Sequence, residues 1–212
     1  MKQVSKLHYI VTNSAEAEQA CKGGVDWIQL RLKNIAYDEY KTVALEVQAV
    51  CRRHSASFII NDTVNLALDI HADGVHIGKE DMPPANARKI LGENFIIGCT
   101  ANTLEDIIQL SAQTVDYIGL GPYRFTNTKE RLSPVLGVEG YRSIFTGLHN
   151  RTVNIPPVIA IGGITENDVE ELLLTGLHGI AVSGAISNSG NIVNAAQRFN
   201  NIINNQVQQI KT

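Results

Sequence analysis

One segment of the sequence, Trp27–Lys33, carries two cations and an amide at alternating positions. With the two-residue period of a β-strand, Gln29, Arg31 and Lys33 face one side, and the apolar residues between them face the other. An ordinary half-buried strand with its polar side in water would show the same alternation. If several polar strand ends met at one rim, however, these two cations would supply positive charge for an anionic substrate.

Amide and acidic residues follow two later apolar runs. Asn61 and Asp62 close the run that starts at Ser57, and Asp81 follows the run that starts at Gly74. Either aspartate alone would be interpreted as a helix cap or a solvated turn residue. Mg²⁺ commonly takes one or two protein carboxylates and completes its octahedron with substrate phosphates and water. Among phosphate-binding cations, the two aspartates therefore predict a Mg²⁺ site.

Glycine-containing turns end the last two apolar runs. Gly162 and Gly163 follow the first of them, and Ser183 and Gly184 follow the second. Glycine lets backbone N–H groups approach a ligand closely, although tight turns use glycine everywhere. If the strands close into a (β/α)8 barrel, these two turns lie where such barrels often bind a phosphate group, after the seventh and eighth strands. A phosphate here and a metal-bound anion across the mouth imply two phosphorylated substrates, or one substrate with two anionic ends.

Eight short apolar runs alternate with helical patterns along the chain. The runs cover 8–12, 27–33, 57–61, 74–78, 95–100, 117–121, 158–163 and 179–183. Helical patterns begin at 14 and 62 and span 37–54, 83–91, 103–112, 138–148, 166–175 and 192–209. Such repeated units predict an α/β fold, a single (β/α)8 TIM barrel over residues 1–212. An open dinucleotide-binding sheet would need a G-x-G-x-x-G turn, which we do not find.

The connection from Pro122 to Gly137 is long, lacks an apolar pattern and is strongly polar over 126–131. Long connections in compact domains often serve as lids or binding segments, and a mobile surface loop is the alternative. In a barrel this connection would start at the same rim as the other polar strand ends. Its Lys129 would then be a third cation at the mouth.

Composition limits the classes of function. The chain has 212 residues, 44% of them hydrophobic and 18% charged, which suits one domain with an ordinary core. A net charge of -3 argues against nucleic acid as a partner. The first six residues lack the apolar run of a signal peptide, and no apolar stretch could cross a membrane. Three cysteines without metal-ligand spacing complete the expectation of a cytoplasmic protein.

Five segments taken in order resemble thiamine-phosphate synthases. They are 29–33 (QLRLK), 61–62 (ND), 72–82 (ADGVHIGKEDM), 121–129 (GPYRFTNTK) and 160–164 (AIGGI). The resemblance runs from the first strand to the eighth. It implies a Mg²⁺-dependent transferase that joins 4-amino-2-methyl-5-hydroxymethylpyrimidine diphosphate to hydroxyethylthiazole phosphate and releases pyrophosphate and thiamine monophosphate. It also suggests a homodimer.

The same resemblance implies roles for individual residues. Asp62 and Asp81 would hold Mg²⁺, and Gln29 would orient the pyrimidine. The residues expected to bind the diphosphate are Arg31, Lys33, Asn61, Thr100 and Lys129, of which Arg31, Lys33 and Lys129 would stabilise charge during catalysis. Those expected to bind the thiazole phosphate are Thr126, Thr128, Gly163, Ser183 and Gly184. His76 and Tyr9 could line the pyrimidine pocket, and for His76 a packed, hydrogen-bonded strand histidine is the alternative.

The chain departs from the family pattern at a few positions. Leu32 replaces a usual Glu, but the alternation points it away from the cations. Thr100 replaces a usual Ser and keeps the hydroxyl, and Asn102 stands where His is frequent. Ser183-Gly184 inverts the usual order of a small apolar residue and Ser, so the phosphate there would depend more on backbone donors.

Three other functions fit parts of this pattern. A thiazole tautomerase relative carries a His after the sixth strand, where this chain has Gly121-Pro122. A non-catalytic barrel could sense a phosphorylated thiamine precursor, although every metal and diphosphate candidate is present. A phosphosugar isomerase would want a general base at a strand end, and no His or Glu is convincingly placed for one.

Overall fold

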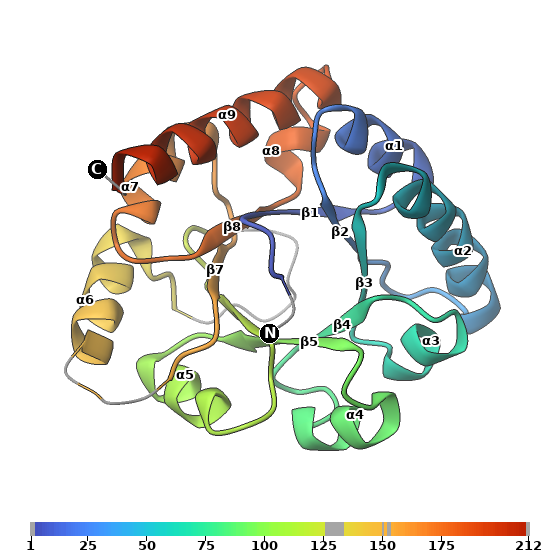
Figure 1. The fold of residues 1–212 in the computed structure, drawn as a ribbon, viewed down its shortest axis with the longest axis horizontal. Helices are drawn as coiled ribbons and strands as arrows, with labels where there is room; N and C mark the ends of the chain where they lie inside the picture. Colours follow the sequence, from blue (N-terminus) through green and yellow to red (C-terminus); the bar gives the residue numbers. More distant parts are fainter. Residues whose placement is uncertain (1–2, 126–133, 150, 152–153, 211–212) are drawn as a thin grey trace.

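Eight parallel strands form a closed barrel in the computed structural model, which describes residues 3–125, 134–149, 151 and 154–210 (Figure 1). The strands are β1 Leu7–Val11, β2 Trp27–Leu30, β3 Ser57–Asn61, β4 Gly74–Ile77, β5 Ile96–Ala101, β6 Tyr117–Leu120, β7 Val158–Ile161 and β8 Gly179–Val182. Each strand pairs with the next, and β8 pairs with β1. The predicted (β/α)8 barrel is confirmed.

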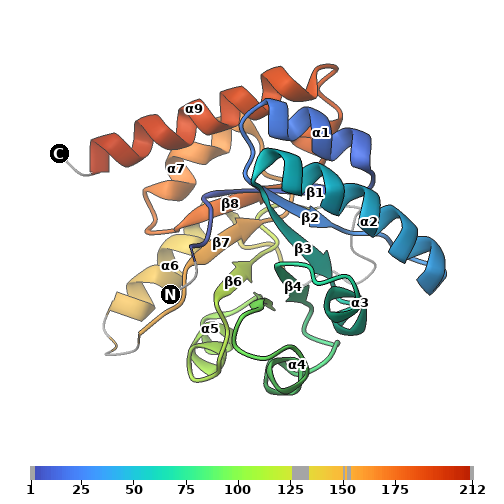
Figure 2. The same ribbon diagram turned by 45° about the vertical axis from the view of Figure 1, so that its right-hand side comes forward.

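Helices surround the barrel on its outer side, as Figures 1 and 2 show. They are α1 Ser14–Lys22, α2 Tyr37–His54, α3 Val64–Asp69, α4 Pro84–Leu91, α5 Leu104–Ser111, α6 Gly137–His149, α7 Val169–Leu173, α8 Gly184–Ser187 and α9 Ile192–Ile210, with a 3-10 turn, η1 Glu166–Asp168, before α7. Within the described ranges, no helix combines the length and apolar character that a membrane span requires.

Most element bounds differ from the sequence prediction by one or two residues, and two differences are larger. β2 ends at Leu30 instead of Lys33. The Arg31 amide still donates to Val11 O on β1 (3.0 Å), but β1 itself ends at Val11, and Asn34 then has a φ of 54°. Arg31 and Lys33 therefore lie just beyond the strand. The helix α8 was not predicted, because a segment of four residues is too short to show a helical period.

Alternating side chains divide the core into two parts. One set packs between the barrel wall and the helices, and the other fills the barrel itself. The inner set consists of Val4, Trp27, Ile59, Ile96, Tyr117, Ile159 and Ala181, with Ile10 and Ile161 packed against it. Because successive strand residues face opposite sides, the inner residues at the start of each strand fix which later residues face the mouth.

Large rings fill the interior, and glycines on the neighbouring strands make room for them. His8 stacks on Trp27 with ring centroids 4.3 Å apart, and Tyr117 meets both rings edge-on. A Cβ added at Gly98 would lie 2.1 Å from Tyr117 Cζ, and one at Gly119 would lie 2.8 Å from His76 Cε1. Only glycine at these positions leaves space for the tyrosine and histidine rings.

Burial of His8 predicts a pH-dependent stability. Its Nε2–H donates to Ser5 O (2.9 Å), and burial holds its pKa well below the ordinary value of 6.5. The unfolded chain therefore binds a proton that the folded chain does not, so the free energy of unfolding should fall as the pH drops below about 6.5, by up to about 1.4 kcal/mol per pH unit for this group. Urea unfolding between pH 7 and 5 measures the slope.

The variant His8→Phe, which keeps a ring against Trp27, should show a shallower slope. The slope that remains reports the other titrating groups, among them His178, whose pKa burial also lowers. His149→Gln, at an exposed position, is the control and should keep the original slope. Equal slopes in all three proteins would contradict the assignment to His8.

Candidate active site at the carboxyl ends of the strands

Closure of the sheet brings the carboxyl ends of the strands to one rim. Asn61 and Gln29 form a buried polar pair just inside this rim. Gln29 Nε2 donates to Asn61 Oδ1 over 2.8 Å, and both side chains are buried. Neighbouring strands β2 and β3 carry them, with Gln29 paired in register with Ile59. The structure therefore brings these two predicted residues together, with the amide oxygen of Gln29 left to contact a ligand.

Asp62 and Asp81 converge over the backbone of Gly78. The Gly78 amide donates to Asp81 Oδ2 (3.0 Å), and a Cβ added at Gly78 would lie 2.5 Å from that oxygen and 3.8 Å from Asp62 Oδ1. Asp62 has a φ of 63°, and its amide donates to His76 O (2.8 Å). The left-handed backbone at Asp62 and the missing side chain at Gly78 thus let two carboxyl groups share one place.

The pKa of Asp62 is raised to about 6. Burial is the main cause, followed by the charge of Asp81 and a hydrogen bond to Asp81, and the positive charge of Arg31 opposes the rise. Asp62 therefore lies close enough to Asp81 and Arg31 for their charges to act on it. Two carboxyl groups so close to each other are best satisfied by a shared proton or by a cation.

The donor set of this pair suits Mg²⁺. Among the described residues, no group of three or more His, Cys, Asp or Glu side chains could hold a metal ion. Asp62 and Asp81 therefore do not form a zinc site of the structural type, in which four protein side chains bind the metal. Two carboxylates with room for water and phosphate oxygens match the way in which Mg²⁺ is usually bound.

Thr100 is held by a chain of buried groups. Burial raises the pKa of Tyr117, and its hydroxyl shares a hydrogen bond with His76 Nδ1 (3.0 Å). On the other side of the ring, His76 Nε2 shares a hydrogen bond with Thr100 Oγ1 (3.1 Å). His76 is thus both a packed strand histidine and the group that orients Thr100.

The expectation that Tyr9 lines the pyrimidine pocket is wrong. Tyr9 is fully buried in the outer part of the core, between the barrel wall and the helices, and its hydroxyl bonds to Ser187 Oγ (2.8 Å) on α8. β1 presents His8 and Ile10 to the barrel interior, so Tyr9 must face outward. Tyr9 therefore supports the short helix after Ser183 instead of contacting a ligand in the mouth.

Asn102 and Lys79 have structural partners at the rim. Asn102 Nδ2 donates to Gly121 O and links the ends of β5 and β6. Lys79 Nζ lies 2.8 Å from Asp106 Oδ2, and that carboxylate also accepts the amides of Asn102 and Thr103. These contacts fix the loop after β5, and Lys79 does not add an unpaired cation to the mouth.

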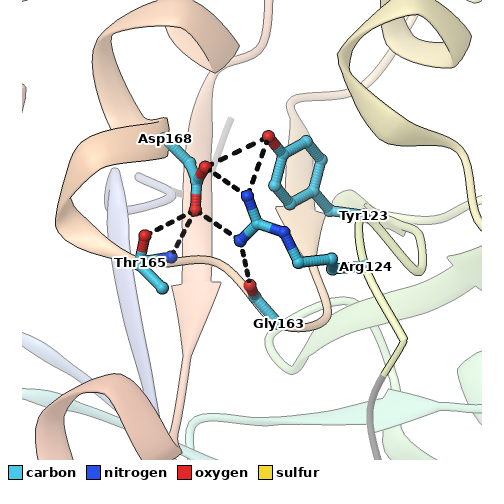
Figure 3. Close-up of polar contacts among 5 residues, drawn as sticks. All are labelled: Tyr123, Arg124, Gly163, Thr165 and Asp168. Carbon is cyan, nitrogen blue, oxygen red and sulfur yellow. Dashed lines mark hydrogen bonds and ion pairs between the residues drawn. The ribbon is translucent and has the colours of Figure 1, made fainter.

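The turn after β7 is joined to the connection after β6 by contacts that the sequence did not reveal (Figure 3). Arg124 pairs with the buried Asp168 and also donates to Gly163 O (2.9 Å). Gly162 and Gly163 have φ values of 101° and 69°. Gly163 is therefore where the sequence predicted it, at an exposed turn on the rim, but two unpredicted charged residues hold it there.

Ser183 and Gly184 lie at the end of β8. Ser183 is half-buried, and its carbonyl accepts the amides of Ile186 and Ser187 as the first turn of α8 forms. Gly184 is exposed at the beginning of that helix. Both residues thus belong to the same rim as Gly163.

The other predicted residues divide into two groups. Arg31 is half-buried and close enough to Asp62 to affect its pKa, whereas Lys33 is exposed beyond β2. Thr126, Thr128 and Lys129 lie outside the described residues. Their predicted roles in binding phosphate and diphosphate stay predictions.

Comparisons with known proteins agree with the resemblance seen in the sequence. A family model described as thiamine monophosphate synthase matches residues 7–186. A thiamine-phosphate synthase of Phocaeicola vulgatus is 48% identical over 186 residues, 88% of this chain and 89% of the relative. One of Clostridium novyi is 39% identical over 185 residues, 87% and 88% of the two chains. The solved structure of thiamine phosphate pyrophosphorylase from Pyrococcus furiosus has a TM-score of 0.83 and 32% identity, and covers 95% of this chain and 96% of its own.

The shared position of the two aspartates predicts a titration near neutral pH. In metal-free protein, the Asp62 carboxyl should titrate with a pKa of about 6, and Asp81→Asn should lower it, because the neighbouring charge disappears while burial stays. Carbon-detected NMR of labelled aspartate side chains follows the pKa directly. Asp69→Asn, an exposed carboxylate paired with Lys41, is the control and should leave the titration of Asp62 unchanged. An unchanged pKa of Asp62 in Asp81→Asn would contradict the coupling.

Proposed function

Because the chain belongs to the thiamine monophosphate synthase family, we propose that it joins 4-amino-2-methyl-5-hydroxymethylpyrimidine diphosphate to hydroxyethylthiazole phosphate. In this reaction the bond between the pyrimidine methylene carbon and the diphosphate oxygen breaks. The thiazole nitrogen forms a new bond to the same carbon, and thiamine monophosphate and pyrophosphate are the products. The convergence of Arg31, Asp62 and Asp81 at the barrel mouth is the observation that carries the proposal.

The reaction does not need a protein nucleophile. The electron-rich aminopyrimidine stabilises positive charge on the methylene carbon, so the leaving pyrophosphate can depart with much of the bond broken before the thiazole attacks. Catalysis then requires charge stabilisation on the leaving group and correct placement of the thiazole nitrogen. A site with cations and metal-binding carboxylates but without an activated nucleophile suits this chemistry.

Each part of the mouth has a distinct task in this proposal. Asp62 and Asp81 would hold Mg²⁺, which would supply positive charge to neutralise the diphosphate. Arg31 and Lys33 donate to diphosphate oxygens, and the Thr100 hydroxyl, oriented by His76, adds a neutral donor. Lys129, in the connection after β6, completes the set of cations. Together these groups bind the leaving group more tightly as its negative charge grows.

The buried amide pair provides a place for the pyrimidine. Asn61 accepts the hydrogen bond from Gln29 and so fixes the orientation of its side chain. With its Nε2 engaged, Gln29 presents an oxygen that accepts a hydrogen bond from the exocyclic amino group of an aminopyrimidine. The aromatic rings below form a rigid floor. We therefore place the pyrimidine over Gln29, with its diphosphate toward Arg31 and Asp62.

The thiazole tautomerase alternative lacks its expected histidine. The position after β6 is Gly121-Pro122, and the next residue, Tyr123, donates its hydroxyl to Asp168 (3.1 Å). Neither Pro122 nor Tyr123 offers a base for proton transfer at this rim. A sensor without catalysis would bind the same substrates without releasing pyrophosphate, so the product assay distinguishes it from the synthase.

The remaining parts of the proposal concern the surroundings of the enzyme. We propose that the protein acts in the cytoplasm on small phosphorylated substrates, without nucleic acid or membrane partners, and that it forms a homodimer. The net charge of -3 supports the absence of a nucleic-acid partner, and the family resemblance supports the dimer. Light scattering coupled to gel filtration measures the mass of the assembly.

Substitutions of the rim residues test the assignment. Arg31→Ala and Asp62→Asn should each lower the rate of pyrophosphate release on the order of a hundredfold or more, because charge stabilisation of the leaving group is lost. Asparagine is chosen at 62 because it tolerates the left-handed backbone there, with φ of 63°. The assay contains both substrates and Mg²⁺ and measures pyrophosphate and thiamine monophosphate, with each component omitted in turn.

Two controls make the result specific. Asp69→Asn, on the outer face of the barrel, should keep the original rate. Thermal unfolding should show that Arg31→Ala and Asp62→Asn are folded. Unchanged turnover in both rim variants would reject the site, and tautomerised thiazole without condensation would favour the tautomerase.

A further inference from the structure

Arg124 and Asp168 connect two loops of the barrel mouth that are far apart in the sequence. Arg124 Nη2 donates to Asp168 Oδ1 (2.6 Å), and Nη1 donates to Asp168 Oδ2 (2.8 Å), so the pair is bidentate (Figure 3). Arg124 follows β6, and Asp168 lies in the 3-10 turn after β7. Neither residue has a role in the proposed reaction as described above.

Asp168 is itself firmly held. The Thr165 amide and hydroxyl donate to Asp168 Oδ2 over 2.8 and 2.7 Å, and the Tyr123 hydroxyl donates to Oδ1. Burial would raise the pKa of Asp168, but the hydrogen bonds from Arg124 and Thr165 outweigh it and hold the pKa well below its usual range. The carboxylate therefore stays charged and forms a fixed anchor for the guanidinium group, which also lies over the Tyr123 ring at 4.7 Å.

Arg124 also donates hydrogen bonds to both carbonyl groups of the turn formed by Gly162 and Gly163. Its backbone amide donates to Gly162 O (2.9 Å), and its Nη1 donates to Gly163 O (2.9 Å). In a trans peptide the carbonyl and the next N–H point in opposite directions. The N–H groups of Gly163 and Ile164 are therefore turned away from Arg124. Within the described part of the chain, neither of these two N–H groups has a hydrogen-bond acceptor.

The contact between the two loops is close enough to require glycine. A Cβ added at Gly163 would lie 2.8 Å from Arg124 Cβ, and the φ of Gly163 is 69°. Farther along the chain, the Leu136 amide donates to Pro122 O (2.9 Å) and the Gly137 amide to Tyr123 O (3.0 Å). The backbone of residues 122–124 is thus fixed from several sides, and the Arg124 side chain extends from a fixed point toward Asp168 and Gly163.

From this geometry we propose that Arg124 and Asp168 are positioning residues that aim the N–H groups of Gly163 and Ile164 at the phosphate of the thiazole substrate. The inference rests on the proposed function and adds to it the means by which the turn is oriented. In this role Arg124 orients the turn, because its Nη1 and Nη2 groups are engaged by Asp168 and Gly163. A pair of fixed backbone donors makes a concave site that suits a phosphate monoester.

Kinetics with both substrates varied separately tests this role. In Arg124→Gln, the KM for hydroxyethylthiazole phosphate should rise about tenfold, because hydrogen bonds to a charged group are lost or weakened. The KM for the pyrimidine diphosphate should stay within about twofold, since its binding residues belong to other strand ends. Asp168→Asn should show the same selective rise, and the double variant should be no worse than the more affected single variant, because the two residues act as one unit.

Two further variants separate positioning from general stability. Arg124→Lys keeps the charge but loses the bidentate geometry, so its KM for the thiazole phosphate should lie between those of the original chain and Arg124→Gln. Arg142→Gln removes an arginine whose side chain is equally exposed, 49%, and paired with Glu171 on the outer face. It is the matched control and should leave both KM values unchanged.

The outcomes distinguish the two proposals. No product from the unsubstituted chain would overturn the proposed function and this inference with it. Normal condensation by the unsubstituted chain, with the same KM for the thiazole phosphate in Arg124→Gln, would overturn the positioning role alone. An equal rise in both KM values, accompanied by a lower melting temperature, would also overturn it, because that pattern belongs to a purely structural ion pair.

Discussion

The pairing of β8 with β1 is the constraint on which the rest of the structure depends. It closes the parallel sheet, so all eight carboxyl ends must meet at one rim. Closure also creates an interior that has to be filled without voids. Trp27 and Tyr117 fill it from β2 and β6, and Gly98 and Gly119 leave the space that the rings of Tyr117 and His76 occupy. The mouth therefore rests on a rigid aromatic floor.

This floor connects core packing to the chemistry above it. Tyr117 belongs to the inner core, yet its hydroxyl is hydrogen-bonded to His76, which in turn is hydrogen-bonded to the Thr100 hydroxyl. A core substitution at Tyr117 would thus change both packing and the direction of a donor at the rim. The orientation of a donor at the rim is thus coupled to the packing of the core.

Sequence periodicity predicted the strands well, because eight apolar runs of similar length leave few alternatives to a parallel barrel. It placed the end of β2 too late, since the polar alternation continues through Lys33 although the hydrogen-bonded ladder stops. Asp62 and Asp81 could be predicted as a pair because each follows a strand. The role of Arg124 could not be, because a single cation in a polar connection shows no period and its partner, Asp168, lies 44 residues away.

The two sides of the mouth would attract an anion in different ways. Around Asp62 and Asp81 an anion must be accompanied by a cation, because bare carboxylates repel it. Near Gly163 the charge of Arg124 is already balanced by Asp168, so an anion there meets backbone dipoles instead of net charge. On the proposed assignment, the more highly charged diphosphate gains most at the first side, and the monophosphate is accommodated at the second. Two phosphorylated substrates can then be told apart by charge as well as by shape.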